Sequence, residues 1–195
     1  MRGIIVGTGR SGTGYMHKVL CDAGVACGHE QIFTPNGVVN PTPLEMDSSW
    51  MAVPWLSSYP RTPVILVHRH PAAVISSFVG IGFFDVNSSP LHSPYRNFLY
   101  AKNPRLKDKT PFEAACEHYV DWNQRALRYA TVVTELDNPD WGSIASELKI
   151  VPAHLAAALP NVSQTYNHRP RANIDLDMIP VEVWEMRAEL MEASS

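Results

Sequence analysis

Three features of the sequence predict an α/β fold with a central parallel sheet. Strand-like and helix-like patterns alternate along the chain, as they do where helices join parallel strands. The apolar run Ile4–Val6 is followed by a glycine-rich turn at 7–14 and then by apolar residues at helical spacing. A second apolar run, Pro63–Val67, has the length and composition of a buried strand. With 195 residues, the chain is expected to form a single domain over 1–195.

The first strand, the turn and the first helix have the layout of a phosphate-binding loop. Glycines allow the backbone to turn tightly and to approach an anion closely. The unpaired N–H groups at the start of the following helix, together with the positive end of its dipole, then face that anion. The helix itself is expected to include Tyr15 to Leu20, where apolar residues recur at helical spacing.

A second short strand is expected over Val25–Gly28, and it leads into two polar residues, His29 and Glu30. In open parallel sheets, ligands bind at the carboxyl edge of the strands, which makes both residues candidates for a site. Because successive side chains of a strand point to opposite faces, we expect only one of the two to face the ligand.

Loop-forming residues dominate the next part of the chain. Residues 31–46 are rich in Pro, Gly and Asn and predict a loop, after which Ser48–Ser49 can cap a short helix over 50–56. The strand Pro63–Val67 leads into a helix over 71–78, whose first position is a proline, as suits the first turn of a helix.

The second half of the chain begins with a long segment, 84–110, in which aromatic residues are scattered among Pro, Ser and Asn. A segment of this length is expected to be a lid or a binding loop. The sequence Thr110–Glu113 marks the start of the longest helix, expected over 112–129. The remaining elements are expected as a β-branched strand at 130–134, helices at 140–148, 152–159 and 180–192, and a polar stretch at 161–177.

Composition and charge narrow the class of protein. A net charge of −3 argues against a general nucleic-acid-binding protein, because such proteins are usually basic. The three cysteines lack the spacing of metal ligands, which favours buried thiols in a reducing compartment. No apolar stretch is long enough to cross a bilayer, and Met1 and Arg2 lead directly into the first strand. We therefore expect a cytoplasmic protein with neither a membrane span nor a signal peptide.

The glycine-rich turn differs from the loop of nucleotide hydrolases at two positions. Gly7 and Gly12 match the two glycines of the pattern G-x-x-x-x-G-K-[ST], but Thr13 stands where the lysine would be and Gly14 where the Mg²⁺-binding hydroxyl would be. Both missing groups are central to the hydrolysis of nucleoside triphosphates. The basic residue is instead Arg10, so the loop is suited to an anion, and no metal is expected.

The sequence Arg10-Ser11-Gly12-Thr13 resembles the 5′-phosphosulfate loop of the sulfotransferases that use 3′-phosphoadenosine-5′-phosphosulfate (PAPS). Gly14 stands where the family often has a second threonine. The resemblance, which extends to small bacterial members, implies a three-layer α/β/α fold of the P-loop superfamily. It also implies that Gly9 to Gly14 bind PAPS and that Tyr15 stacks on the adenine, although a core aromatic of the first helix is an equal alternative for Tyr15.

The segment Val67–Ser77 resembles the second part of the same signature, an arginine at the end of a central strand with a serine two helical turns later. The resemblance implies that Arg69 and Ser77 bind the 3′-phosphate of PAPS. An arginine supplies a forked and permanently charged donor, which suits a phosphate. Members of the family often bring a third basic segment to this phosphate, for which Arg169 and Arg171 are the candidates, although a solvated basic loop is an equal alternative.

The resemblance also implies roles in sulfuryl transfer. Arg10 and the N–H groups of the loop would neutralise charge on the leaving phosphate, and a histidine or a glutamate beside the loop would take the acceptor's proton. Members that act on carbohydrates commonly carry a glutamate after the second strand. This favours Glu30 as the base, with His29 as the alternative.

Three functions are open at this point: a PAPS-dependent sulfotransferase, a nucleotide-binding module without transfer activity, and an atypical P-loop phosphotransferase. The acceptor would be a hydroxyl or an amine of a small molecule, a carbohydrate or a lipid. The segment 84–110 could cover a sugar or a hydrophobic alcohol equally well. The sequence makes no prediction of the oligomeric state.

Overall fold

The computed structural model describes residues 1–40, 43–161 and 171–195. Its centre is a five-stranded sheet with the strand order β2-β5-β1-β6-β7, in which every neighbouring pair is parallel. The strands, in chain order, are β1 (Gly3–Val6), β2 (Cys27–His29), β5 (Met46–Ser48), β6 (Val64–His68) and β7 (Val132–Glu135). The expected α/β class with a parallel sheet is therefore confirmed.

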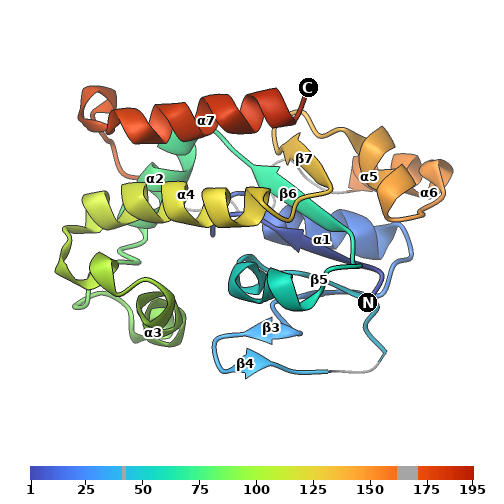
Figure 1. Cartoon of the computed structure of the whole chain (residues 1–195), viewed down its shortest axis with the longest axis horizontal. Helices are drawn as coiled ribbons and strands as arrows, with labels where there is room; N and C mark the ends of the chain where they lie inside the picture. The colour runs from blue at the N-terminus through green and yellow to red at the C-terminus, as the bar shows by residue number, and fades with distance from the viewer. Residues whose placement is uncertain (41–42, 162–170) are drawn as a thin grey trace.

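Helices cover both faces of the sheet and give three layers (Figure 1). One face packs against α1 (Thr13–Asp22), α5 (Trp141–Glu147) and α6 (Pro152–Ala158). The other face packs against α2 (Pro71–Gly80), the 3₁₀ helix η1 (Trp50–Ser58), α4 (Pro111–Leu127) and α7 (Val181–Ala193). In Figure 1, α4 and α7 lie side by side on this second face.

The strands carry apolar side chains to both layers, which explains their nearly continuous hydrophobic sequences. In β1, Ile4 and Val6 enter the cluster that contains α2 and α4, whereas Ile5 enters the cluster that contains α1. All three side chains are fully buried. A parallel sheet covered on both faces needs this composition, because neither side of the pleat meets water.

The prediction that residues 31–46 form a loop is wrong in two respects. It contains a small antiparallel hairpin of β3 (Phe33–Thr34) and β4 (Gly37–Val38), and it ends in β5, which lies between β1 and β2. Only Met46 of the β5 sequence, Met-Asp-Ser, is apolar, so the segment lacks the apolar run that is typical of a buried strand. It can be buried because the Asp47 carboxylate finds backbone donors inside the fold, so its polar group does not need water.

The predicted long loop at 84–110 is also corrected, because it contains η2 (Pro90–His92), α3 (Ser93–Lys102) and η3 (Pro104–Asp108). Phe98, Leu99 and Tyr100 of α3 are buried in the hydrophobic core. Apolar burial therefore outweighs the local preference of the Pro and Asn residues around α3 for a loop.

Several predicted elements are confirmed with small shifts at their ends, as for α2, α4, β6, β7 and α7. The predicted helix start at 110–113 is a complete capping box, in which the Thr110 and Glu113 side chains each bond to the backbone of the other residue. Ser49 caps η1 by accepting a hydrogen bond from the N–H of Met51 at 3.2 Å.

Two further short 3₁₀ helices, η4 (Leu159–Asn161) and η5 (Leu176–Met178), precede α7. Among the described residues, no helix is long and apolar enough to span a bilayer.

The capping box gives a test of the fold. We expect Thr110→Ala to lower the free energy of unfolding by about 1 kcal/mol, because the first turn of α4 loses its side-chain acceptor. The measurement is urea denaturation followed by circular dichroism. Thr62→Ala is the control, since the Thr62 hydroxyl makes no hydrogen bond within the described residues. Equal stability of the Thr110→Ala protein and the wild type would contradict the proposed contribution of the cap.

Candidate functional site

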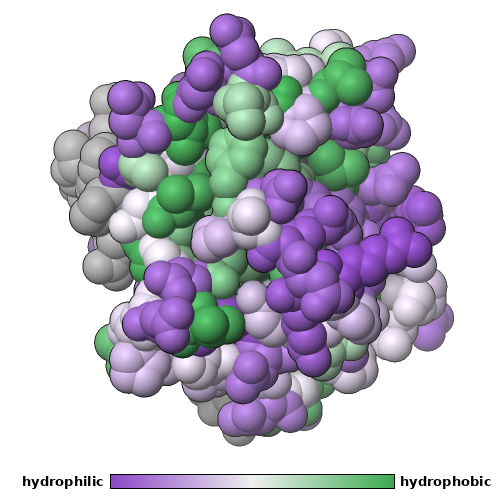
Figure 2. Space-filling model, turned by 90° about the vertical axis from the view of Figure 1, so that its left-hand side faces the viewer, coloured by the Kyte–Doolittle hydropathy of each residue, from purple (hydrophilic) through white to green (hydrophobic). Residues whose placement is uncertain are grey.

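A pocket of about 860 Å³ opens beside the carboxyl ends of β1, β2 and β6. Figure 2 shows the side of the molecule toward which β6 points in Figure 1, and on it hydrophobic and hydrophilic residues occupy neighbouring areas. The predicted site residues that line the pocket are Gly9, Arg10, Gly12, Thr13, Gly14, Tyr15, His29, Glu30, Arg69, Ser77 and Arg171. Residues that are distant in the sequence thus meet in one place.

The turn between β1 and α1 has the geometry of an anion-binding loop. A side chain at Gly7 would place its Cβ 2.3 Å from the carbonyl oxygen of Val67, so only glycine fits there. Gly12 has a φ of 111° and precedes α1, whose first turn has no side-chain cap. No side chain at the cap position therefore accepts a hydrogen bond from the N–H groups at the start of α1. These N–H groups lie next to the pocket.

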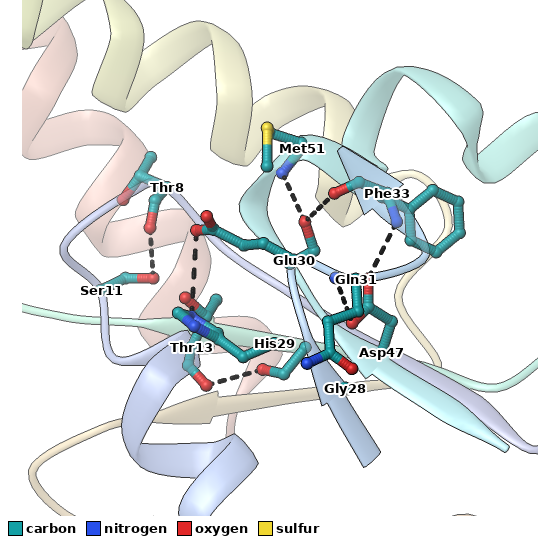
Figure 3. Close-up of polar contacts among 12 residues, drawn as sticks. Thr8, Ser11, Thr13, Gly28, His29, Glu30, Gln31, Phe33, Asp47 and Met51 are labelled. Carbon is teal, nitrogen blue, oxygen red and sulfur yellow. Dashed lines mark hydrogen bonds and ion pairs between the residues drawn. The ribbon is translucent and has the colours of Figure 1, made fainter. Parts of the chain in front are cut away.

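Ser11 is the predicted loop residue that does not line the pocket. Its hydroxyl donates to the carbonyl of Thr8 at 2.7 Å, and its N–H donates to the same carbonyl at 3.1 Å (Figure 3). The residue is completely buried. Ser11 therefore holds the shape of the turn, and its side chain points away from the space where a ligand would lie.

The two predicted motifs touch each other through Arg10 and Ser77. The Nε of Arg10 donates to the Ser77 hydroxyl at 2.9 Å, which joins the loop to the middle of α2. Arg10 has a φ of 72°, a left-handed conformation that turns its side chain toward the pocket. The sequence predicted both residues as binding residues but did not predict their contact.

Arg69 and Arg171 contribute positive charge to the same pocket. Arg69 lies 3.6 Å from the carboxylate of Asp137, and its buried Nε has no hydrogen-bond acceptor among the described residues. A buried donor without an acceptor is uncommon in folded proteins and is suited to a ligand oxygen. The other candidate of the third basic segment, Arg169, lies outside the described residues.

Tyr15 lines the pocket from the first turn of α1. Its ring lies 6.5 Å from that of Trp141, with the two planes tilted by 50°. Burial raises the pKa of the Tyr15 hydroxyl, so this group stays protonated at neutral pH. The ring is thus an aromatic surface beside the loop, at the position where the resemblance implies stacking on the adenine of PAPS.

His29 and Glu30 both line the pocket, and which of them would face a ligand stays a prediction. β2 ends at His29, and Glu30 has a φ of 58°, so the alternation of side chains along a strand does not extend to it. The left-handed turn brings the carboxylate of Glu30 to 3.9 Å from Nε2 of His29 and directs it toward the turn that holds Thr8 and Ser11 (Figure 3).

The proton affinities of the two residues move in opposite directions. Burial, followed by the nearby charge of Asp47, raises the pKa of Glu30 to about 7. Burial, followed by the proximity of His17, lowers the pKa of His29 to about 4. At neutral pH the imidazole is therefore uncharged, and the 3.9 Å contact is too long for a hydrogen bond. Glu30 is the group of this pair that titrates near neutrality.

Asp47 of β5 fixes the segment that follows Glu30. Its Oδ1 accepts from the N–H of Gln31 at 3.2 Å, and its Oδ2 accepts from the N–H groups of Ile32 and Phe33 at 3.0 and 2.9 Å (Figure 3). The residue is fully buried. This arrangement satisfies three backbone donors and holds the left-handed turn in which Glu30 lies.

Several pocket residues were not predicted from the sequence. They are the mainly apolar and aromatic residues Trp50, Phe78, Ile81, Phe83, Leu91, His92 and Tyr95, and the segment after β7 with Leu136, Asp137 and Pro139. A sequence signal existed for the second group, because these residues follow a predicted core strand and so belong to the same carboxyl edge. The first group comes from η1, α2, η2, α3 and the segment that follows α2, and no local pattern connects them.

No model of a protein family matches the chain. A search of curated protein sequences also finds no match. Within the residues that the structure describes, no three His, Cys, Asp or Glu side chains are grouped as a metal site requires.

The raised pKa of Glu30 predicts a pH-dependent effect on stability. A carboxyl group whose pKa is higher in the folded protein than in the unfolded chain favours folding below its unfolded pKa, near 4.5, and this contribution is lost as the pH rises through about 7. We therefore expect Glu30→Gln to leave stability unchanged at pH 4 and to increase the free energy of unfolding at pH 8, by up to about 3 kcal/mol.

The measurement is urea denaturation of the wild type and the variant at both pH values. Glu192→Gln, at an exposed position of α7, is the matched control, for which no gain between pH 4 and pH 8 is expected. A Glu30→Gln protein that is no more stable than the wild type at pH 8 would show that the ionised Glu30 carboxylate does not lower the free energy of unfolding.

Proposed function

We propose that the protein transfers a sulfuryl group from PAPS to a hydroxyl or amine of an acceptor. The observation that carries this proposal is that three arginines from separate segments of the chain line one pocket. Arg10 lies on the glycine-rich loop, and Arg69 and Arg171 lie on other elements of the same pocket. PAPS carries anionic groups at two separate positions, the 5′-phosphosulfate and the 3′-phosphate, and so requires two sites.

The loop and the start of α1 are suited to the 5′-phosphosulfate. The positive end of the helix dipole and the N–H groups near Gly12 and Thr13 favour an anion at this position. Arg10 adds a full positive charge beside them. These groups stabilise the negative charge that grows on the phosphate as the sulfuryl group leaves it.

Arg69, Ser77 and Arg171 are suited to the 3′-phosphate. The Ser77 oxygen already accepts a hydrogen bond from Arg10, which leaves its proton available to a phosphate oxygen. The buried Nε of Arg69 is a further donor that lacks an acceptor among the described residues. Phosphate oxygens would satisfy both donors.

Glu30 is the proposed base. Its carboxylate removes the proton of the acceptor as the acceptor's oxygen or nitrogen bonds to sulfur and the bond between sulfur and the phosphate oxygen breaks. The products are the sulfated acceptor and 3′,5′-adenosine bisphosphate (PAP). A base works best when its pKa lies near the working pH, and the pKa of Glu30, about 7, meets this condition better than that of His29, about 4.

Calorimetry with PAP, ADP and ATP, each with and without Mg²⁺, distinguishes this function from a phosphotransferase. Preference for PAP in the absence of a metal supports a PAPS site. Tight binding of ATP that depends on Mg²⁺ would support a phosphotransferase instead.

The two-site proposal predicts which residue recognises the 3′-phosphate. We expect Arg69→Ala to weaken binding of PAP by about 10- to 100-fold and to leave binding of 5′-AMP almost unchanged, because 5′-AMP has no 3′-phosphate. Calorimetry with both nucleotides measures the two affinities. The control is Arg61→Ala, which removes an exposed arginine outside the pocket and should alter neither affinity. Equal losses for PAP and 5′-AMP would mean that Arg69 does not recognise the 3′-phosphate.

The role of Glu30 predicts loss of transfer without loss of nucleotide binding. Release of PAP from PAPS, measured over a panel of acceptors, should fall by about 100-fold or more in Glu30→Gln, since the amide cannot take the proton. In the wild type the rate should rise as the pH increases through about 7 and the carboxyl group ionises. Wild-type protein that binds PAP but consumes no PAPS with any acceptor would instead support the nucleotide-binding module.

A further inference from the structure

The pocket has a charged half and an aromatic half that meet at the glycine-rich loop. Phe78 lies directly against Gly9, since a Cβ at this glycine would come 2.9 Å from the Phe78 ring and 3.9 Å from that of Trp50. Phe83 continues the same wall, with its ring 5.2 Å from that of Phe78 and 6.4 Å from that of Trp50. Leu91 completes the apolar lining toward solvent.

This aromatic wall is held firmly from behind. The indole Nε1 of Trp122 donates to the carbonyl of Trp50 at 2.7 Å. The buried guanidinium of Arg96 donates to the carbonyls of Phe83 and Asp85 at 3.0 and 2.8 Å. The wall is therefore preformed and does not need to be ordered by a ligand, which favours binding.

Glu30 lies at the junction of the two halves. The Trp50 side chain and the positive charge of Arg10 both lower the pKa of Glu30 and so favour its carboxylate, and burial, followed by the charge of Glu30, raises the pKa of Tyr95. The carboxylate is thus close to the loop on one side and to the aromatic wall on the other. A group held against the wall would meet Glu30 and the proposed sulfuryl position together.

The aromatic half offers few hydrogen-bond partners. Besides Glu30, its described lining has polar side-chain atoms only on Trp50, Tyr95 and His92. A sugar enclosed here would leave several hydroxyl groups without partners, and each would lose its bonds to water. An apolar skeleton would lose little and would gain by covering Leu91, a residue that is 78% exposed.

From this arrangement we infer that the aromatic half of the pocket binds an apolar alcohol, aryl or alkyl, with its hydroxyl directed toward Glu30. The inference rests on the proposed function for the role of this alcohol as the sulfuryl acceptor, but the binding itself can be measured without PAPS.

Calorimetry with 2-naphthol and with methyl glucoside tests the inference on the full chain, with and without PAP. We expect 2-naphthol to bind at least tenfold more tightly than methyl glucoside. Leu91→Ala should weaken binding of 2-naphthol by about three- to tenfold, because part of the apolar cover is removed. The matched control is Leu176→Ala, a leucine that is 52% exposed and lies outside the pocket, and it should leave the affinity unchanged.

Tighter binding of methyl glucoside, or no binding of 2-naphthol, would overturn the inference, as would equal affinities of 2-naphthol for Leu91→Ala and the wild type. Binding of PAP, measured on the same samples, separates this result from the proposed function. Protein that binds 2-naphthol as expected but does not bind PAP would contradict the PAPS-dependent function and support the apolar site. Protein that binds PAP but not 2-naphthol would overturn the apolar site alone.

Discussion

The turn between β1 and α1 is confined on two sides, and the candidate site depends on this confinement. Gly7 lies so close to the carbonyl of Val67 in β6 that no side chain would fit. Gly12, with its left-handed backbone, faces the Leu136 side chain that follows β7. The shape of the turn therefore depends on its contacts with β6 and with the residue that follows β7. The orientation of Arg10 and the exposure of the α1 N–H groups follow from that shape.

Two carboxyl groups, those of Asp47 and Glu30, determine the geometry of the site on the side of β2 and β5. Three backbone N–H groups point at the carboxylate of Asp47 and offset part of the cost of burying its charge, although burial still raises its pKa. The same bonds hold the turn that places Glu30 in a left-handed conformation, which costs a residue other than glycine about 1 kcal/mol. The charge of Asp47 then adds to burial in raising the pKa of Glu30. One buried carboxylate thus positions a second and adds to the effect of burial on its pKa.

The proposed function and the proposed acceptor both depend on the two halves of the pocket. Arg10 and Arg69 make one half suited to anions, and the rings of Phe78 and Phe83 make the other half suited to apolar groups. Glu30 is the ionisable group at their boundary. A ligand that brings a hydroxyl from the apolar half toward the charged half would present it to this carboxylate.

The sequence alone determined the α/β class, the glycine-rich turn, the helix start at Thr110 and most of the charged pocket residues. These features follow from local patterns, namely apolar runs, glycine positions and the known edge at which parallel strands carry ligands. The fold decided the features that depend on distant partners. β5 is a strand because its Asp47 meets backbone donors from another segment, and α3 forms because Phe98 and Leu99 reach the core. Only the tertiary structure could bring the aromatic wall together, because its rings come from separate elements and pack through contacts that no local sequence pattern encodes.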